Sequence, residues 1–156
     1  MIVVRSVKSS MIVLPTDTIV HNLKADEGYR AHAYQCGSGA WTVAYGRNID
    51  QNHGGLGISQ PEAEFLLRND VDRCVDELRR TFGWVAEQPA DVQVVLVELT
   101  FWLGLTRLRK FRKCLAALES GDRTTAAAEL IDSRLYRQIP GRTKRLADRM
   151  RGADAD

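Results

Sequence analysis

Glu27, Cys36 and Thr42 are the residues whose types and spacing could do chemistry in this sequence. They fall within KADEGYRAHAYQCGSGAWTVAYGR, where the cysteine follows the glutamate by nine residues and the threonine follows the cysteine by six. A carboxylic acid held at a helix end against a sheet is a candidate general acid, because partial burial disfavours the ionised form. Alone this is a weak signal, since most such glutamates are surface residues. A hairpin after Glu27 would strengthen it by bringing the cysteine and the threonine back toward the helix end.

The elements that would position these residues can be outlined from local patterns. After a candidate cap at Thr16 or Asp17, apolar residues recur on one side of DTIVHNLKADEG and Gly28 supplies a stop signal, which predicts a short helix ending at Glu27. Aromatic and β-branched residues then alternate through residues 40–45 after a glycine turn at 37–39, which predicts a hairpin or small antiparallel sheet. We therefore expect Glu27 to face a short sheet.

The remaining chain reads as helices. The segment SQPEAEFLLRNDVDRCVDELRRTFG opens with a capping box and a proline in its first turn, and then repeats apolar residues at helical spacing. We expect this long helix to join two lobes of one α+β domain, because 156 residues are too few for two large domains. The predicted plan is an N-terminal extension, an α+β lobe, an inter-lobe helix, a helical lobe and a tail, at residues 1–15, 16–58, 59–83, 84–152 and 153–156.

Charge and hydropathy narrow the classes of partner. The net charge is only +2, but basic residues crowd into the last quarter of the chain. This cluster is either a solvated helix face or a surface that attracts a polyanion such as a nucleic acid, a membrane or a wall polymer. No nucleic-acid-binding motif is recognisable, so no nucleic-acid partner is expected. Arg5 and Lys8 divide the apolar N-terminus into runs too short for an export signal or a stable membrane anchor.

The cysteines and histidines suggest neither a disulfide framework nor a metal site. Cys74 and Cys114 fall in apolar helical patterns and are expected to be buried free thiols. Cys36 differs because it lies in a polar turn rich in glycine. The histidines lack a second ligand at useful spacing, so no metal and no cofactor is implied; they are His21, His32 and His53.

The segment from Asp26 to Arg47 resembles the motif of a known family. DEGYRAHAYQCGSGAWTVAYGR is similar to the pattern of Glu, eight residues, Asp or Cys, five residues and Thr in the phage-type lysozymes, or endolysins, of glycoside hydrolase family 24. ISQPEAEFLLRNDV, FWLG and SRLYRQIPGRTKR resemble later parts of that family, so the likeness extends over residues 16–152. It implies a two-lobed lysozyme-like fold with a sheet-containing first lobe.

The resemblance also implies a reaction, which is hydrolysis of the β-1,4 bond between N-acetylmuramic acid and N-acetylglucosamine in peptidoglycan. Glu27 would protonate the leaving oxygen, while Cys36 and Thr42 would activate or position the attacking water. Many relatives carry aspartate where this chain has Cys36. Three roles therefore stay open for the thiol: a thiolate base, a spectator, or a redox-sensitive group whose oxidation blocks the site.

Further site residues follow from the same resemblance. Arg142 resembles the family arginine that lies against the catalytic glutamate and supports it. Phe101 resembles an aromatic residue of the substrate cleft, although core packing is an equal alternative. Arg47 and Asn48 would lie at the cleft rim and bind substrate.

The implied biological setting is bacteriophage-directed lysis of a bacterial host. The enzyme is expected to be a monomer that accumulates in the host cytoplasm and reaches the peptidoglycan through a separate membrane pore, a holin. Two alternatives stay open: a lytic transglycosylase, in which Glu27 serves as acid and then as base, and a catalytically silent wall-binding protein.

Overall fold

A computed structural model describes residues 16–152 of the chain and divides them into two compact units, with the division after Gln60. The predicted N-terminal extension and C-terminal tail lie outside the described residues. The structure is mostly helical and carries one small antiparallel sheet, which confirms the predicted α+β class. Each unit is described by itself below.

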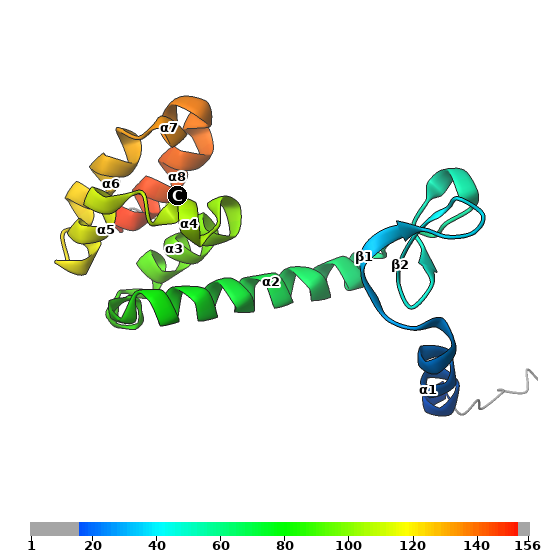
Figure 1. The fold of residues 1–156 in the computed structure, drawn as a ribbon. Helices are drawn as coiled ribbons and strands as arrows, with labels where there is room; N and C mark the ends of the chain where they lie inside the picture. Colours follow the sequence, from blue (N-terminus) through cyan, green and yellow to red (C-terminus); the bar gives the residue numbers. More distant parts are fainter. Residues whose placement is uncertain (1–15, 153–156) are drawn as a thin grey trace, which may run out of the picture. The chain divides into compact units, whose positions relative to one another are not determined.

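The first unit consists of one helix, a three-stranded sheet and a short 3-10 turn (Figure 1). The sheet has the order β1-β2-β3, with antiparallel pairing throughout. The expected helix through Glu27 and the expected hairpin after it are both present. The elements are α1 (Thr16–Glu27), β1 (Arg30–Gln35), β2 (Trp41–Ala44), β3 (Arg47–Asn48) and η1 (Gln51–His53).

The register of the sheet centres on Thr42. This residue pairs with Tyr34 of β1 on one side and with Asn48 of β3 on the other. The turn before β2 is closed by a hydrogen bond from the amide of Gly39 to the carbonyl of Cys36, at 2.8 Å. Gly39 has a φ of +84°, a conformation that glycine adopts without the strain a Cβ would bring. The glycine turn seen in the sequence therefore places Cys36 beside the start of β2.

The second unit is all helical. The long α2 belongs to it except for its first residue. The capping box and the proline in the first turn explain where α2 begins. The elements are α2 (Gln60–Thr81), η2 (Gly83–Glu87), α3 (Ala90–Leu103), α4 (Leu105–Leu108), α5 (Arg112–Glu119), α6 (Arg123–Ile131), α7 (Arg134–Gln138) and α8 (Pro140–Arg151).

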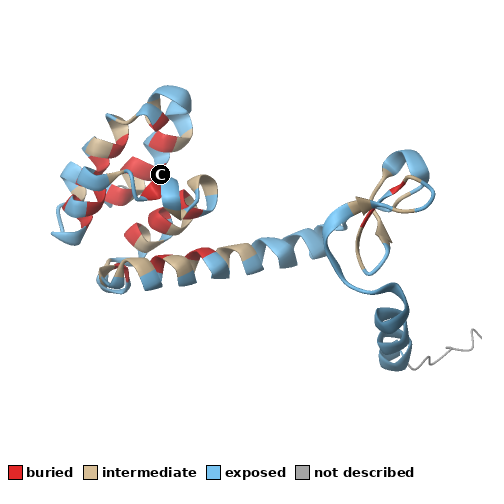
Figure 2. Ribbon diagram, viewed as in Figure 1, coloured by how far each residue is buried: buried red, intermediate tan, exposed pale blue. Residues whose placement is uncertain are grey.

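The hydrophobic core of the second unit lies among α3, α5, α6 and α8 (Figure 2). The strongly apolar sequence of α3 predicts a buried helix, and Val92, Val95 and Leu96 are fully buried. Cys74 and Cys114 are buried free thiols, as expected. None of the helices described between residues 16 and 152 has the length and apolar character needed to cross a membrane.

Arg123 joins three helices of this unit. Its guanidinium forms an ion pair with the carboxylate of Asp91 on α3, and its Nε donates a hydrogen bond of 2.7 Å to the carbonyl of Met150 on α8. We expect Arg123→Ala to lower the free energy of unfolding by about 2 kcal/mol, because it leaves partly buried acceptors without a donor. Urea denaturation measures the loss. The control is Arg145→Ala, at an exposed arginine on α8 that forms no ion pair with any residue from 16 to 152. An equal loss in both variants would contradict the assignment.

Candidate active site

Glu27 is the last residue of α1, and its carboxyl group lies over the turn between β2 and β3. A Cβ placed on Gly46 of that turn would meet Oε2 of Glu27 at 2.9 Å. Gly46 has a φ of +77°, so the backbone conformation and the close approach both favour glycine here. The turn adjoins the pair Val43–Arg47, which is next to the pair Thr42–Asn48. Glu27 therefore faces the sheet, as the sequence predicts.

Aromatic contacts hold the end of α1 beside the same turn. The rings of Tyr29 and Tyr45 lie 5.5 Å apart between centroids, and Lys24 Nζ lies 5.7 Å from the centroid of the Tyr45 ring. The partial burial expected for Glu27 is not provided by its own unit, where the side chain is exposed. The residue beneath the carboxyl group is Gly46, which has no side chain that could cover the carboxyl group.

We expect Gly46→Ala to displace the Glu27 carboxyl as well as to strain the turn. The added methyl group would collide with Oε2, and a positive φ costs an alanine roughly 1–2 kcal/mol. The matched control is Gly54→Ala, because Gly54 also has a positive φ, +70°, but has open space around its Cβ position. Both variants should lose similar stability in urea, whereas only Gly46→Ala should lose cell-wall lysis beyond that. Equal lysis by the two variants would contradict the contact.

Cys36 lies at the end of β1 in a network of hydrogen-bonding groups. Its Sγ is 3.0 Å from the hydroxyl oxygen of Ser38. Hydrogen bonds from the Ser38 side chain, the Ser38 amide and the Thr42 hydroxyl lower the pKa of the thiol from 9.0 to about 7. The lowered pKa thus comes from neutral hydrogen-bonding groups that stabilise the thiolate, without a cationic side chain. About half of such thiols are ionised at pH 7.

Thr42 joins Cys36 in this network. It is only 4% exposed, and its hydroxyl donates a hydrogen bond of 3.1 Å to the carbonyl of Ala40. A threonine hydroxyl has one proton, so the Ala40 carbonyl and the Cys36 sulfur compete for it. The structure therefore brings Cys36 and Thr42 together. It also adds Ser38, which the sequence reasoning missed although its position two residues after Cys36 in a tight turn was a usable signal.

Asn48 and Arg47 hold the loop that follows the sheet. The Asn48 side chain accepts a hydrogen bond from the Asp50 amide at 2.9 Å and donates one to the His53 carbonyl at 3.0 Å. Arg47 Nε donates to the carbonyl of Gly57 at 2.9 Å. Both side chains thus form hydrogen bonds within the loop, and their substrate-binding roles stay predictions.

Asp50 is a second residue that sequence reasoning missed. Its carboxylate oxygens accept hydrogen bonds from the backbone amide of Asn52 and contact Nδ1 of His53, each at 2.9 Å. The same carboxylate receives a longer bond of 3.4 Å from the amide of Trp41, the neighbour of Thr42. The signal available in the sequence was an aspartate just before a short turn segment, where it caps the backbone. Asp50 thus ties the loop to the strand that carries Thr42.

The other predicted site residues belong to the second unit. The guanidinium of Arg142 stacks over the ring of Trp102, with Cζ 4.2 Å from the ring centroid. Phe101 is 45% exposed, so the core-packing alternative accounts for only part of its surface. The roles of Arg142 and Phe101 toward Glu27 and the substrate stay predictions. Within the described residues, no group of three or more His, Cys, Asp or Glu side chains could hold a metal ion.

The first unit thus presents the Glu27 carboxyl group at the end of α1, over the sheet. The Thr42 hydroxyl lies in strand β2, and the Cys36 thiol lies in the turn before that strand. Acid-catalysed cleavage of a glycosidic bond with attack by water uses an acid and a second group that activates the water. The family model of the phage lysozymes matches residues 24–149, a range that includes all three groups. The chain belongs to the phage lysozyme family.

Several curated proteins are similar to this chain. An "Endolysin" of Acyrthosiphon pisum secondary endosymbiont phage 1 is 32% identical over 109 residues, which cover 70% of this chain and 72% of that protein. A "Probable T4-type lysozyme 2" of Dictyostelium discoideum is 26% identical over 80% of this chain and 88% of its own length. The "Peptidoglycan hydrolase gp36" of Pseudomonas phage phiKMV is 25% identical over 80% of this chain, and the match spans 14% of that longer protein.

Proposed function

We propose that this chain is an endolysin, a muramidase that hydrolyses the β-1,4 bond between N-acetylmuramic acid and N-acetylglucosamine in peptidoglycan. Membership of the phage lysozyme family and the names of its relatives support a peptidoglycan-lytic enzyme. The observation that carries the finer proposal is the Glu27 carboxyl lying over the Gly46 turn, at the edge of the sheet that holds Cys36 and Thr42. The proposal thus assigns an acid and a water-positioning pair to one small unit.

In the proposed mechanism, two proton transfers accompany one displacement. Glu27 gives its proton to the glycosidic oxygen as the bond from that oxygen to the anomeric carbon breaks. Water, held by the Thr42 hydroxyl, attacks the anomeric carbon and passes a proton to the Cys36 thiolate. Exchange with solvent then returns a proton to Glu27 and removes one from Cys36, so that the enzyme is restored.

The second unit and the loop would supply support for this chemistry. Arg142 is proposed to orient Glu27, and Phe101 is proposed to offer an aromatic face to a sugar ring. Asn48 and Arg47 are proposed to bind the glycan from the loop after the sheet. Arg142→Lys keeps the charge but loses the planar guanidinium, so it separates an orienting role from a purely electrostatic one.

The chemical outcome is tested by analysing the ends of the cleaved glycan. Purified peptidoglycan is digested with the enzyme, and mass spectrometry of the fragments follows. Reducing N-acetylmuramic acid ends would support hydrolysis by water. Ends carrying 1,6-anhydro-N-acetylmuramic acid would instead identify a lytic transglycosylase and overturn the assignment of Cys36 and Thr42 to a water molecule.

The biological setting belongs to the same proposal. The enzyme would act as a monomer, gather in the host cytoplasm and meet the wall after a holin has opened the membrane. Expression of the chain in bacteria with and without a co-expressed pore-forming holin tests this route. Rapid lysis in both cultures would contradict it.

A further inference from the structure

The segment that joins α4 to α5 concentrates positive charge on the second unit. Five of the seven residues from 107 to 113 are basic, and we call this group the basic ridge. A hollow of about 640 Å³ lies on one side and is lined by Thr106 and by members of the ridge. A second hollow, of about 950 Å³, extends from the ridge to α7. The ridge consists of Arg107, Arg109, Lys110, Arg112 and Lys113.

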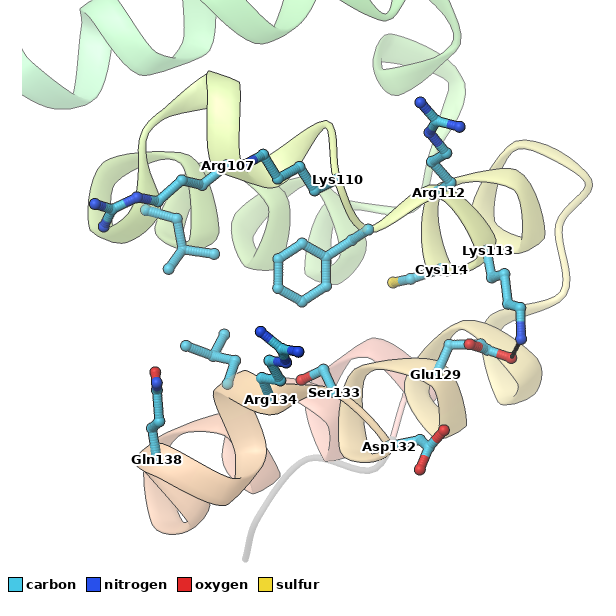
Figure 3. Close-up of a pocket in the computed structure, with 13 residues that line it drawn as sticks. Arg107, Lys110, Arg112, Lys113, Cys114, Glu129, Asp132, Ser133, Arg134 and Gln138 are labelled. Carbon is cyan, nitrogen blue, oxygen red and sulfur yellow. Dashed lines mark ion pairs between the residues drawn. The ribbon is translucent and has the colours of Figure 1, made fainter.

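Most of this charge is uncompensated within the described residues. Lys113 pairs with Glu129 at 3.8 Å, as the dashed line in Figure 3 marks. The other four members of the ridge are exposed and have no ion pair among residues 16–152. Crowded like charges repel one another, so an external anion would relieve the repulsion as well as gain attraction. The charge of the ridge therefore favours an acidic partner.

The larger hollow combines cations and apolar side chains near the ridge and α7 with two carboxylates on its α6 side, those of Glu129 and Asp132. In Figure 3, Arg107 and Lys110 extend from one wall, and Arg134 and Gln138 extend from the opposite wall. Leu103, Phe111 and Leu135 also line this hollow, and all three are partly or fully buried. A ligand that contacts both the cations and the apolar side chains of this hollow would carry an anionic group next to an apolar group.

The arrangement of the ridge selects among acidic partners. Lys110 and Arg112 line both hollows, so the ridge presents cations to two adjoining hollows and can meet several anionic groups at once. Guanidinium groups suit phosphate because they can donate two parallel hydrogen bonds. Phosphates dense enough to engage both hollows, with apolar groups beside them, are supplied by the headgroups of a lipid surface.

We propose that the basic ridge binds anionic phospholipid headgroups and holds this protein reversibly against a membrane surface. This interaction goes beyond the proposed cleavage of peptidoglycan and uses none of the residues assigned to it. Each Lys or Arg close to an anionic bilayer contributes roughly a fivefold gain in binding. Removing two members of the ridge should then weaken binding by roughly 25-fold.

Cosedimentation of the full chain with lipid vesicles tests the proposal. Two vesicle types are used, phosphatidylcholine alone and phosphatidylcholine mixed with phosphatidylglycerol. The test variant is Lys110→Gln/Arg112→Gln. The control is Arg68→Gln/Arg145→Gln, which makes the same change in net charge at exposed arginines of the same unit that line neither hollow. Circular dichroism and thermal melting confirm that both variants fold.

The expected result is binding of the unmodified chain to the anionic vesicles alone, a large loss in the test variant and a small loss in the control. Binding should weaken with added salt, because exposed charges are screened. Equal losses in the two variants would overturn the proposal in favour of a general charge effect. Absence of binding to phosphatidylglycerol vesicles would also overturn it, as would tighter binding to soluble polyphosphate or duplex DNA than to those vesicles.

Discussion

Glu27→Gln is expected to lower the rate of peptidoglycan cleavage by roughly 10²–10⁴-fold, the usual contribution of a general acid. Glutamine keeps the shape of the side chain but has no acidic proton for the leaving oxygen. The side chain should still lie over Gly46, because the glutamine amide has the same shape as the carboxyl group whose Oε2 makes the contact there. The fall in turbidity of outer-membrane-permeabilised cells measures the rate, and zymography on embedded cell walls gives an independent readout.

The chain offers a matched control for this prediction. Asp26 precedes Glu27 on α1 and is likewise exposed, so Asp26→Asn removes one neighbouring carboxylate without touching the proposed acid. Asp26→Asn should clear walls at a rate close to that of the unmodified enzyme. Clearing by Glu27→Gln at the same rate would remove Glu27 from the mechanism. Absence of clearing by the unmodified enzyme would favour a silent wall-binding protein.

Cys36→Ser is expected to lower the activity by about 100-fold near neutral pH, if the thiolate accepts the proton of the attacking water. Oxygen replaces sulfur with little change in shape, but a serine hydroxyl does not ionise near pH 7. Unchanged activity would show that the thiol is a spectator and leave the water to Thr42. Activity that is unchanged by the substitution but no longer blocked by peroxide would identify a redox-sensitive thiol.

The pH dependence of the activity is a second test of the role of Cys36. Hydrogen bonds from Ser38 and Thr42 lower the pKa of Cys36 to about 7, and the active form of a base is the deprotonated one. The contribution of Cys36 is therefore lost as pH falls through about 7 and is present above it. Ser38→Ala removes the largest cause of the lowered pKa and should move the acidic limb of the activity profile to higher pH. Cys36→Asp should move it to lower pH, because an ordinary aspartate ionises near pH 4.

Alkylation separates the ionisation of the thiol from catalysis. The rate of reaction with iodoacetamide follows the thiolate fraction. Cys36 should react first, because burial raises the pKa of Cys74 and raises that of Cys114 to about 12. The midpoint of the alkylation profile should agree with the acidic limb of activity in the unmodified enzyme and shift with it in Ser38→Ala. A limb that stays in place while the alkylation midpoint moves would exclude Cys36 as the base.

The amino-acid sequence by itself determined the local elements and pointed to the groups proposed to react. The candidate caps Thr16 and Asp17 and the stop at Gly28 predicted α1, with Glu27 at its end. The glycine turn and alternating residues predicted the hairpin, and the apolar sequence of α3 predicted a buried helix. These features depend on neighbours a few residues apart, so periodicity and turn chemistry are sufficient to find them.

Only the tertiary structure decided how those groups meet. It brought the carboxyl of Glu27 against Gly46, directed Ser38 toward the sulfur of Cys36, and used Asp50 to tie the loop to the sheet. Each contact depends on the path of the backbone through turns, and side chains that are close in space are not marked as such by spacing in the sequence. The exposure of Glu27 within its unit was likewise not predictable, because burial depends on which side chains surround a residue after folding.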